Sequence, residues 1–324
     1  MDDNGQQRLK FGIARSQDDQ LEARLGAVKA HRRARMELAV EPPPGLTGQP
    51  RQLSLSRLAE TVLPHALRAV GMLRRGQANA TRIQVCRNLV PISRLPAEFQ
   101  GYTILHLTDL HADVSTGAMQ ALPQAIAGLR YDVCVITGDF RGRTFGPYEP
   151  SLNLIRQAVR EIVAPMFGVL GNHDSGQMVR CLEDMGIQML LNERRVIRRG
   201  SARLWLAGVD DPHHYRTDDV RKAMIDIPQD EPSVLLAHST DCLRDASRQG
   251  VSLILCGHTH GGQICLPGGV PVLTSSAMPR RLASGAWRVG SLQGYTSRGI
   301  GTSALDVRFN CPPEVTLHTL VAGM

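Results

Sequence analysis

Five short apolar runs in this sequence each end in a cluster of Asp, Asn or His residues, and this feature constrains the fold more than any other. The last run, Leu253–Cys256, leads directly into residues 257–262, which read Gly-His-Thr-His-Gly-Gly. A short apolar run bounded by turn-forming residues is typical of a buried strand. Four earlier runs end in the same way, at residues 108–111, 137–140, 170–174 and 236–239. Because α/β proteins bind ligands at the carboxyl ends of strands, the pattern predicts that the five clusters form one site.

From residue 81 onward, apolar runs that resemble strands alternate with segments of helical periodicity. The predicted strands cover residues 82–91, 102–108, 132–137, 166–170, 203–209, 233–237 and 252–256, and the predicted helices cover 116–129, 151–163, 177–185 and 218–225. Three later segments, 263–266, 289–295 and 315–321, have the pattern of antiparallel strands. Such alternation is typical of sheets that are covered by helices.

The first 79 residues have a different character, and we divide the chain at residues 50 and 79. Residues 1–50 are polar and charged, so we expect a mobile basic tail with a short helix near Leu21–Leu38. Residues 51–79 form an amphipathic helical segment, in which apolar residues recur at helical spacing over Leu53–Arg75. Pro64 is expected to kink or delay this helix, and Gly76 to end it. Residues 80–324 form the main domain.

The positive charge of the chain lies in its N-terminal part. The formal net charge is +7, and residues 1–99 contain 16 Lys and Arg against 9 Asp and Glu, whereas the remainder contains 21 of each kind. The basic segment 53–75 either packs on the main domain or makes a peripheral contact with an anionic membrane. An aromatic content of 4% leaves little for base stacking, so we expect no specific nucleic acid partner.

The distribution of apolar residues and cysteines bears on the location of the protein. No stretch approaches the roughly 18 apolar residues that a membrane-spanning helix needs. The seven cysteines are scattered without a C-x-x-C pair, which is typical of buried thiols in a reducing compartment. We therefore expect a cytoplasmic protein, and the membrane alternative places it peripherally on the inner face of the membrane.

The clusters at the strand ends supply hard and borderline metal ligands. They contain the carboxylates of Asp109 and Asp139, the amide of Asn172, and four imidazoles besides that of His173. This set suits two divalent cations such as Mn, Fe, Zn or Ni, and no thiolate is placed to compete. Taken singly, a strand-end Asp commonly caps a helix, and a buried His is commonly a satisfied core residue. Five such clusters in succession are hard to explain in that way.

The order of these residues resembles that of the calcineurin-like metallophosphoesterase superfamily. Asp-x-His, Gly-Asp, Gly-Asn-His-Asp, His and Gly-His-x-His follow one another from Asp109 to His260. The stretch 295–303, together with 313–317, resembles a bacterial subgroup that includes UDP-2,3-diacylglucosamine pyrophosphatases. The resemblance covers residues 80–324. It implies an α/β (α+β) fold, namely a four-layer α-β-β-α sandwich of two mixed sheets.

The resemblance also implies a role for each residue of the series. Two metal ions would share seven ligands: Asp109, His111 and His260 for one ion, Asn172, His238 and His258 for the other, and Asp139 as the bridge between them. A hydroxide that bridges the two ions would attack phosphorus. His173 would protonate the leaving oxygen, and Asp174 would orient the ring of His173.

We therefore expect a dinuclear metal-dependent phosphoesterase that hydrolyses a phosphoester or pyrophosphate bond. Its substrate would be a phosphorylated small molecule, with a lipid-linked compound or a nucleotide sugar as the more specific expectation. The loop 210–215 is a further candidate to border the pocket, and five arginines either clamp a diphosphate or are solvated surface residues: Arg141, Arg143, Arg280, Arg281 and Arg298. The alternative is a metal-binding scaffold on the same fold that recruits a protein partner without turnover. The presence of Asp139 and His173 favours the enzyme.

Overall fold

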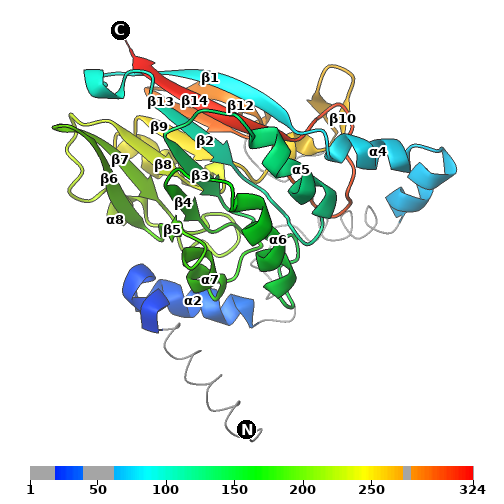
Figure 1. Ribbon diagram of the computed structural model, residues 1–324. Coiled ribbons are helices and arrows are strands. Elements are labelled where there is room, and N and C mark those ends of the chain that lie inside the picture. Colours follow the sequence, from blue (N-terminus) through cyan, green and yellow to red (C-terminus); the bar gives the residue numbers. More distant parts are fainter. Residues whose placement is uncertain (1–18, 39–61, 273–278, 324) are drawn as a thin grey trace, which may run out of the picture.

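The computed structural model describes residues 19–38, 62–272 and 279–323 of the chain (Figure 1). Among these residues, the strands form two large mixed sheets and one small hairpin. The first sheet has the order β1 (Gln84–Ile92), β14 (Glu314–Ala322), β2 (Thr103–Leu107), β3 (Val133–Thr137), β4 (Met166–Val169) and β5 (Ile187–Met189). Strands β2 to β5 are mutually parallel, whereas β14 runs antiparallel to β2 and parallel to β1. The carboxyl ends of β2, β3 and β4 therefore lie at one edge of this sheet.

The second sheet has the order β12 (Gly285–Val289), β13 (Leu292–Thr296), β9 (Leu253–Cys256), β8 (Ser233–Leu236), β7 (Ala202–Gly208) and β6 (Glu193–Arg199). Strands β7, β8, β9 and β13 are parallel, and the edge strands β6 and β12 are antiparallel to their neighbours. The small hairpin pairs β10 (Cys265–Leu266) with β11 (Val270–Pro271). Short 3-10 turns occupy Ala97–Phe99, Thr240–Cys242, His260–Gly262 and Arg280–Leu282.

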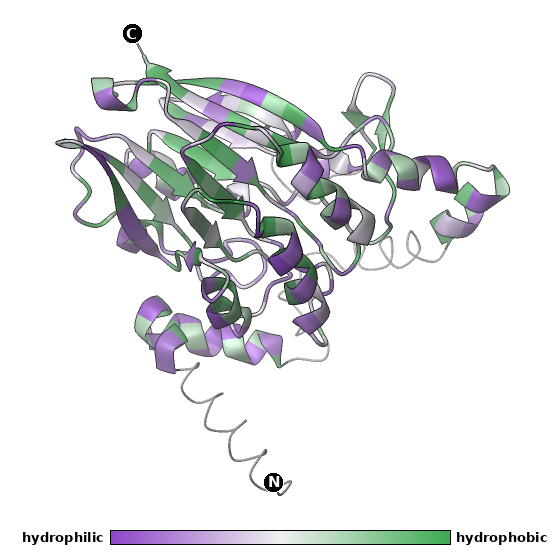
Figure 2. Ribbon diagram, viewed as in Figure 1, coloured by the Kyte–Doolittle hydropathy of each residue, from purple (hydrophilic) through white to green (hydrophobic). Residues whose placement is uncertain are grey.

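Three apolar cores separate four layers. On β3, Val133 and Val135 face the second sheet, while Cys134 and Ile136 face the helices α5 (Thr116–Ile126), α6 (Glu149–Val159) and α7 (Met178–Glu183). This alternation is that of a strand with both faces buried. The helices α8 (Val220–Met224) and α9 (Leu243–Arg248) cover the outer face of the second sheet. Figure 2 shows that the inner strands are mostly apolar, whereas the edge strand β6 is hydrophilic and the helices carry many hydrophilic residues. The predicted four-layer α-β-β-α sandwich is confirmed.

The N-terminal helix packs on the domain. Residues 19–25 and α2 (Ala27–Glu37) are helical, with a break at Gly26, where φ is 84°. Leu25 and Ala30 are buried in the core beside α7, and Arg24 forms ion pairs of 2.8 and 2.7 Å with Glu183 and Glu193. The predicted helix near residues 21–38 is therefore present, but these residues are not a mobile tail, because apolar and ionic contacts fix them. The rest of the predicted tail, 1–18 and 39–50, lies outside the described residues.

The amphipathic segment differs in detail from its prediction. Residues 62–69 are helical, and Gly71, with φ of 70°, separates them from α4 (Leu73–Ala80). The sequence suggested that Gly76 ends the helix, and this prediction is wrong. It lies inside α4, where a Cβ atom would come within 2.8 Å of Val307 and of Phe309, so the close packing explains the glycine. Residues 51–61 of this segment lie outside the described residues.

Several elements were not predicted. The segment 289–295 was expected as one strand. It instead contains the turn between β12 and β13 together with the end of β12 and most of β13, and Gly290 in the turn has a left-handed conformation (φ of 60°). Strand β6, with the sequence Glu-Arg-Arg-Val-Ile-Arg-Arg, has almost no apolar pattern because it is a half-exposed edge strand. Within the described residues, no helix is long and apolar enough to span a membrane.

Candidate metal centre

The carboxyl ends of β2, β3 and β4 in one sheet meet those of β8 and β9 in the other, and the turns that follow these strands carry the predicted ligands. All seven predicted ligands come together there. Two groups of side chains have ligand atoms within 4.8 Å of one another: Asp109, His111 and His260 form one, and Asp139, His238 and His258 form the other. A third such group contains His111, Asp139 and His173, so the two ligand groups are contiguous.

The first group places two imidazole nitrogens beside one carboxylate. His260 Nε2 lies 3.4 Å from Asp109 Oδ1, and His111 Nε2 lies 3.8 Å from the same oxygen. The Nε2 atoms of His111 and His260 are only 3.0 Å apart. Two unprotonated ring nitrogens at this distance present their lone pairs to each other, so a proton or a cation is needed between them. The donor set of this group therefore fits a divalent cation.

The second group surrounds the amide oxygen of Asn172. His238 Nε2 and His258 Nδ1 lie 3.0 and 2.8 Å from Asn172 Oδ1. The other ring nitrogen of His238, Nδ1, donates to the carbonyl of Thr137 at 2.8 Å. A backbone carbonyl on the far ring nitrogen fixes the tautomer that leaves Nε2 available as a ligand. This group of nitrogen and oxygen donors also fits a divalent cation of borderline hardness.

Asp139 lies between the two groups. Its Oδ2 atom is 3.4 Å from His111 Nε2 in the first group and 3.1 Å from His238 Nε2 in the second. The side chain is buried, with 2% of its surface exposed, so water does not screen these contacts. A single carboxylate thus faces both ligand sets, as a bridging ligand would.

The backbone is strained at these residues. Five of the seven predicted ligands have a positive φ although none is glycine: Asp109 (50°), His111 (41°), Asp139 (52°), His258 (73°) and His260 (51°). Such conformations cost about 1–3 kcal/mol each and concentrate at functional sites. These left-handed residues are among those whose ligand atoms lie close together in the cluster.

Glycines before the ligands allow an unusually close approach. A Cβ atom on Gly171 would lie 2.2 Å from Asp139 Oδ1, and one on Gly257 would lie 2.2 Å from Asp109 Oδ2. Real atoms do not approach so closely, so any side chain at either position would displace the neighbouring carboxylate. The glycines of the Gly-Asn-His-Asp and Gly-His-x-His motifs are therefore required by the two carboxylates.

The carboxylates and imidazoles of the cluster shift one another's pKa values. Burial would raise the pKa values of Asp109 and Asp139, but the surrounding imidazoles lower both below the usual range. Burial would lower the pKa of each histidine, yet the two carboxylates raise the pKa of His111 to about 9 and that of His238 to about 10. For His260, burial prevails and lowers the pKa to about 3. Without cations, protons on His111 and His238 supply the positive charge that the carboxylates need.

His173 lies at the edge of the cluster and is partly exposed to solvent, with 24% of its side chain accessible. Its Nε2 atom is 4.0 Å from Asp139 Oδ2, and its Nδ1 atom is 2.7 Å from the hydroxyl of Thr144. Burial of the ring lowers its pKa to about 4, although Asp139 acts in the opposite direction. Thr144, which the sequence did not indicate, is therefore the group that orients this ring.

Asp174 has a different place from the predicted one. Its carboxylate is fully buried and accepts hydrogen bonds from the backbone N–H groups of Phe140, Arg141 and Gly171, at 2.9, 3.2 and 2.8 Å. It does not contact the ring of His173. The expectation that Asp174 orients this ring is wrong. Both oxygens of its carboxylate accept backbone hydrogen bonds that join the turns after β3 and β4.

The predicted diphosphate clamp is also revised. Arg141 is buried and donates to the carbonyls of His173, Thr144 and Gly146, so its guanidinium is not free to bind a substrate. Arg298 forms an ion pair with Glu314. The other three arginines of that set, Arg143, Arg280 and Arg281, are exposed.

Two further residues complete the surroundings of the cluster. In the loop 210–215, the ring of His213 lies 4.2 Å from that of His258, and its Nδ1 atom is 2.7 Å from Asp241 Oδ2, so this loop does border the site. The fully buried Arg308, which the sequence did not indicate, donates to the carbonyls of Arg298 and Gly301 beneath His260. A sequence motif could not reveal Arg308, because it acts through backbone carbonyls.

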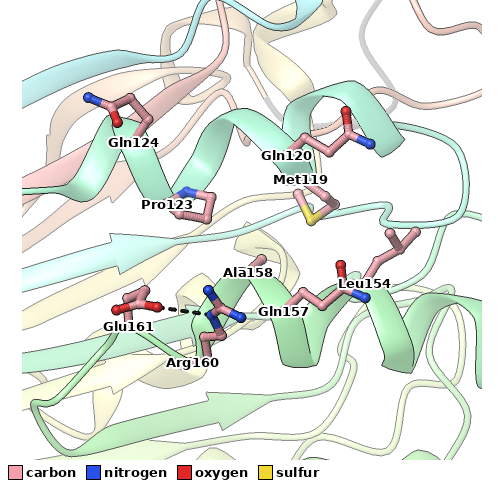
Figure 3. Close-up of a pocket in the computed structure, with 9 residues that line it drawn as sticks. All are labelled: Met119, Gln120, Pro123, Gln124, Leu154, Gln157, Ala158, Arg160 and Glu161. Carbon is pink, nitrogen blue, oxygen red and sulfur yellow. Dashed lines mark hydrogen bonds and ion pairs between the residues drawn. The ribbon is translucent and has the colours of Figure 1, made fainter.

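A cleft of about 520 Å³ lies elsewhere, between α5 and α6 on the outer side of the first sheet (Figure 3). Met119, Pro123 and Leu154 line it, and an ion pair of 2.9 Å joins Arg160 to Glu161 beside it. None of its lining residues belongs to the ligand groups. The cleft therefore has no part in the chemistry of the cluster.

Comparison with known proteins agrees with this geometry. The family model of the calcineurin-like phosphoesterases matches residues 102–262. The uncharacterized metallophosphoesterase YkuE of Bacillus subtilis is 30% identical over 255 residues, which cover 74% of this chain and 85% of that protein. The chain belongs to the calcineurin-like metallophosphoesterases. It is a hydrolase of phosphoester bonds, as the order of the motifs predicted.

Two other relatives carry names that describe an activity. The phosphodiesterase YaeI of Escherichia coli is 29% identical to this metallophosphoesterase, over 68% of this chain and 82% of that protein. The UDP-2,3-diacylglucosamine pyrophosphatase LpxG of Chlamydia trachomatis is 23% identical, over 71% of this chain and 89% of that protein. The relatives thus include both a diesterase and a pyrophosphatase.

Proposed function

We propose that the protein is a dinuclear metallophosphoesterase whose two divalent cations are held by the seven clustered residues. Asp109, His111 and His260 would hold one cation, Asn172, His238 and His258 the other, and Asp139 would bridge them. The observation that carries this proposal is the position of Asp139 Oδ2, which lies 3.4 Å from a nitrogen of one group and 3.1 Å from a nitrogen of the other. Mn, Fe, Zn and Ni all suit these donors.

When bound, two such cations supply Lewis acidity at phosphorus and lower the pKa of water to near neutrality. The residues of the chain retain the cations and keep the ligands in the binding form. The buried carboxylates of Asp109 and Asp139 provide negative charge that retains both cations, and the carbonyl of Thr137 keeps His238 in the ligating tautomer.

His173 would protonate the leaving oxygen. Its Nδ1 atom is engaged by Thr144, which leaves Nε2 directed to the side of the cluster where Asp139 lies. The backbone N–H of His173 donates to Asp139 Oδ1 at 2.9 Å, so the acid and the bridging ligand are held together. Burial lowers the pKa of the His173 ring, and Asp139 acts against burial by favouring the charged form, which is the form that donates a proton.

The substrate class that we propose is a phosphodiester or pyrophosphate, with a lipid-linked or nucleotide-sugar diphosphate as the specific case. The named activities of YaeI and LpxG support this choice. The test is hydrolysis of bis-p-nitrophenyl phosphate, p-nitrophenyl phosphate and UDP-2,3-diacylglucosamine by the Mn-loaded protein, before and after chelation. We expect turnover that chelation abolishes and Mn restores. A protein that binds two cations but turns over none of these compounds would instead support the scaffold function.

We also propose a peripheral membrane contact, on the cytoplasmic face, through the segment 62–75. Val62 and Val70 are 53% and 69% exposed, and Arg68, Arg74 and Arg75 are exposed in the same segment. Near an anionic surface each arginine contributes about 1 kcal/mol of binding. Such a contact would place the catalytic cluster close to a substrate that resides in the membrane.

Vesicle flotation tests the membrane contact. The double variant Val62→Glu/Val70→Glu should lose binding to anionic vesicles, because two charges would enter the interface. Val163→Glu is the matched control, since Val163 is 95% exposed on the loop after α6 and should not matter. Equal flotation of both variants, or none for the unaltered protein, would contradict the proposal.

A further inference from the structure

Arg33 of α2 is a fully buried arginine outside the family match, and it contacts two loops of the catalytic cluster. Its Nη1 atom lies 2.6 Å from Asp210 Oδ1, and its Nη2 atom donates to the carbonyl of Asp174 at 2.6 Å. Its guanidinium also lies over the ring of Tyr215, 4.1 Å from the centroid. Asp174 follows His173 in sequence, whereas Asp210 and Tyr215 begin and end the loop that carries His213.

Glu37, one turn further along α2, extends this contact. It accepts hydrogen bonds from the hydroxyl of Ser175 at 2.6 Å and from the backbone N–H of Gly176 at 2.8 Å. It also forms an ion pair with Arg33 at 2.9 Å. The turn that follows His173 is thus held by α2 at three successive residues, 174 to 176.

The loop 210–219 is held in the same way. Arg32 Nε donates to the carbonyl of Tyr215 at 2.7 Å, and Lys29 binds the carbonyl of Asp218 and the carboxylate of Asp219 at 2.7 and 2.8 Å. Helix α2, which lies next to α7 in Figure 1, therefore connects two loops that come from different sheets.

The chemistry of Arg33 suggests more than a contribution to stability. A buried ion pair costs desolvation energy, and an apolar side chain of similar volume often stabilises a fold equally well. Burial would lower the pKa of Arg33, but Asp210 and Glu37 raise it, so the charge is retained. What only a guanidinium provides is a rigid, planar set of donors that fixes the distance between a carbonyl on one loop and a carboxylate on another.

We propose that α2 is a positioning element of the catalytic cluster and that Arg33 is its positioning residue. Arg33 fixes the turn of His173 relative to the loop of His213, and so sets the ring of His173 against Asp139 and the ring of His213 against His258. This inference rests on the proposed function, because it assigns His173 the role of proton donor. A displacement of a catalytic group by about 1 Å can reduce turnover about 100-fold.

The experiment compares Arg33→Ala with Arg24→Ala in the full-length, metal-loaded protein. Arg24 is the matched control: it also anchors the N-terminal helices through ion pairs, but its partners Glu183 and Glu193 are not in the loops of the cluster. We expect Arg33→Ala to lower kcat about 10- to 100-fold with metal content unchanged. The loss should be smaller for p-nitrophenyl esters, which need little protonation, and millimolar guanidinium should restore part of it. Arg24→Ala should leave kcat nearly unchanged, because its ion-pair partners Glu183 and Glu193 lie outside the loops of the cluster.

A second readout does not depend on turnover. With ¹³C-labelled histidine, the ring resonance assigned to His173 should shift in Arg33→Ala and in the less disruptive Glu37→Gln, but not in Arg24→Ala. If Arg33→Ala does not fold, Glu37→Gln carries both measurements. Equal effects of the Arg24 and Arg33 changes, or an unmoved His173 resonance, would overturn the positioning role. Absence of hydrolysis in the unaltered protein together with the expected shift would refute the proposed function and leave the positioning intact.

Discussion

Proton release on metal binding follows from the electrostatics of the cluster. In the metal-free protein, Asp109 and Asp139 raise the pKa of His111 to about 9 and that of His238 to about 10, although burial acts against them. Both rings are therefore protonated at pH 7, and each must lose its proton to become a ligand. We assign His111 to one cation and His238 to the other. Each cation should thus displace one proton, and two protons should be released per chain.

The affinity for metal should therefore rise with pH. Because the bound form lacks a proton that the free form holds below pH 9, raising the pH favours binding, and the apparent affinity of each site should rise about ten-fold per pH unit between pH 6 and 9. Titration calorimetry with Zn²⁺ or Mn²⁺ in two buffers of different ionisation enthalpy counts the protons directly. His238→Gln should reduce the count from two to one. A count of zero in the unaltered protein, or an affinity that does not change with pH, would refute the assignment of these rings as protonated ligands.

Two further predictions concern residues around the bridging carboxylate. His173→Gln should lower kcat roughly 10²–10⁴-fold while metal content stays unchanged, and the loss should shrink for p-nitrophenyl substrates. An equal loss for good and poor leaving groups, seen in steady-state assays, would remove His173 from the acid role. Gly171→Ala should weaken metal binding, because the added Cβ would lie 2.2 Å from Asp139 Oδ1. Gly146→Ala is its control, since no heavy atom lies within 4 Å there and only backbone strain is added. Equal metal content in both variants would contradict the steric argument.

Much of the site could be predicted from the sequence, because each ligand is recognisable from its immediate neighbours in the chain. Each ligand follows a short apolar strand, and strand ends of a parallel sheet must meet at one edge. The order of motifs from Asp109 to His260 was therefore enough to predict that these seven side chains lie close together. The alternation predicted sheets covered by helices, and the resemblance to the metallophosphoesterases implied the four-layer arrangement, in which both faces of β3 are buried.

The parts that could not be predicted depend on contacts between distant residues. Asp174 has the sequence context of a ring-orienting partner, but its oxygens are taken by three backbone N–H groups, and Thr144 from another turn replaces it. Arg33 looks like one of several arginines in a basic tail until its contacts with Asp210 and Asp174 are seen. The charged strand β6 lacks an apolar pattern because it pairs on one side only.

Metal stoichiometry tests the central claim most directly. Elemental analysis of the purified protein, reconstituted with Mn or Zn and then dialysed, should give about two cations per chain, because the ligands divide into two groups around one bridge. Asp139→Asn should lower this number and abolish hydrolysis, since its carboxylate faces both groups. Two cations retained by Asp139→Asn, or a single cation in an active unaltered protein, would contradict the dinuclear centre.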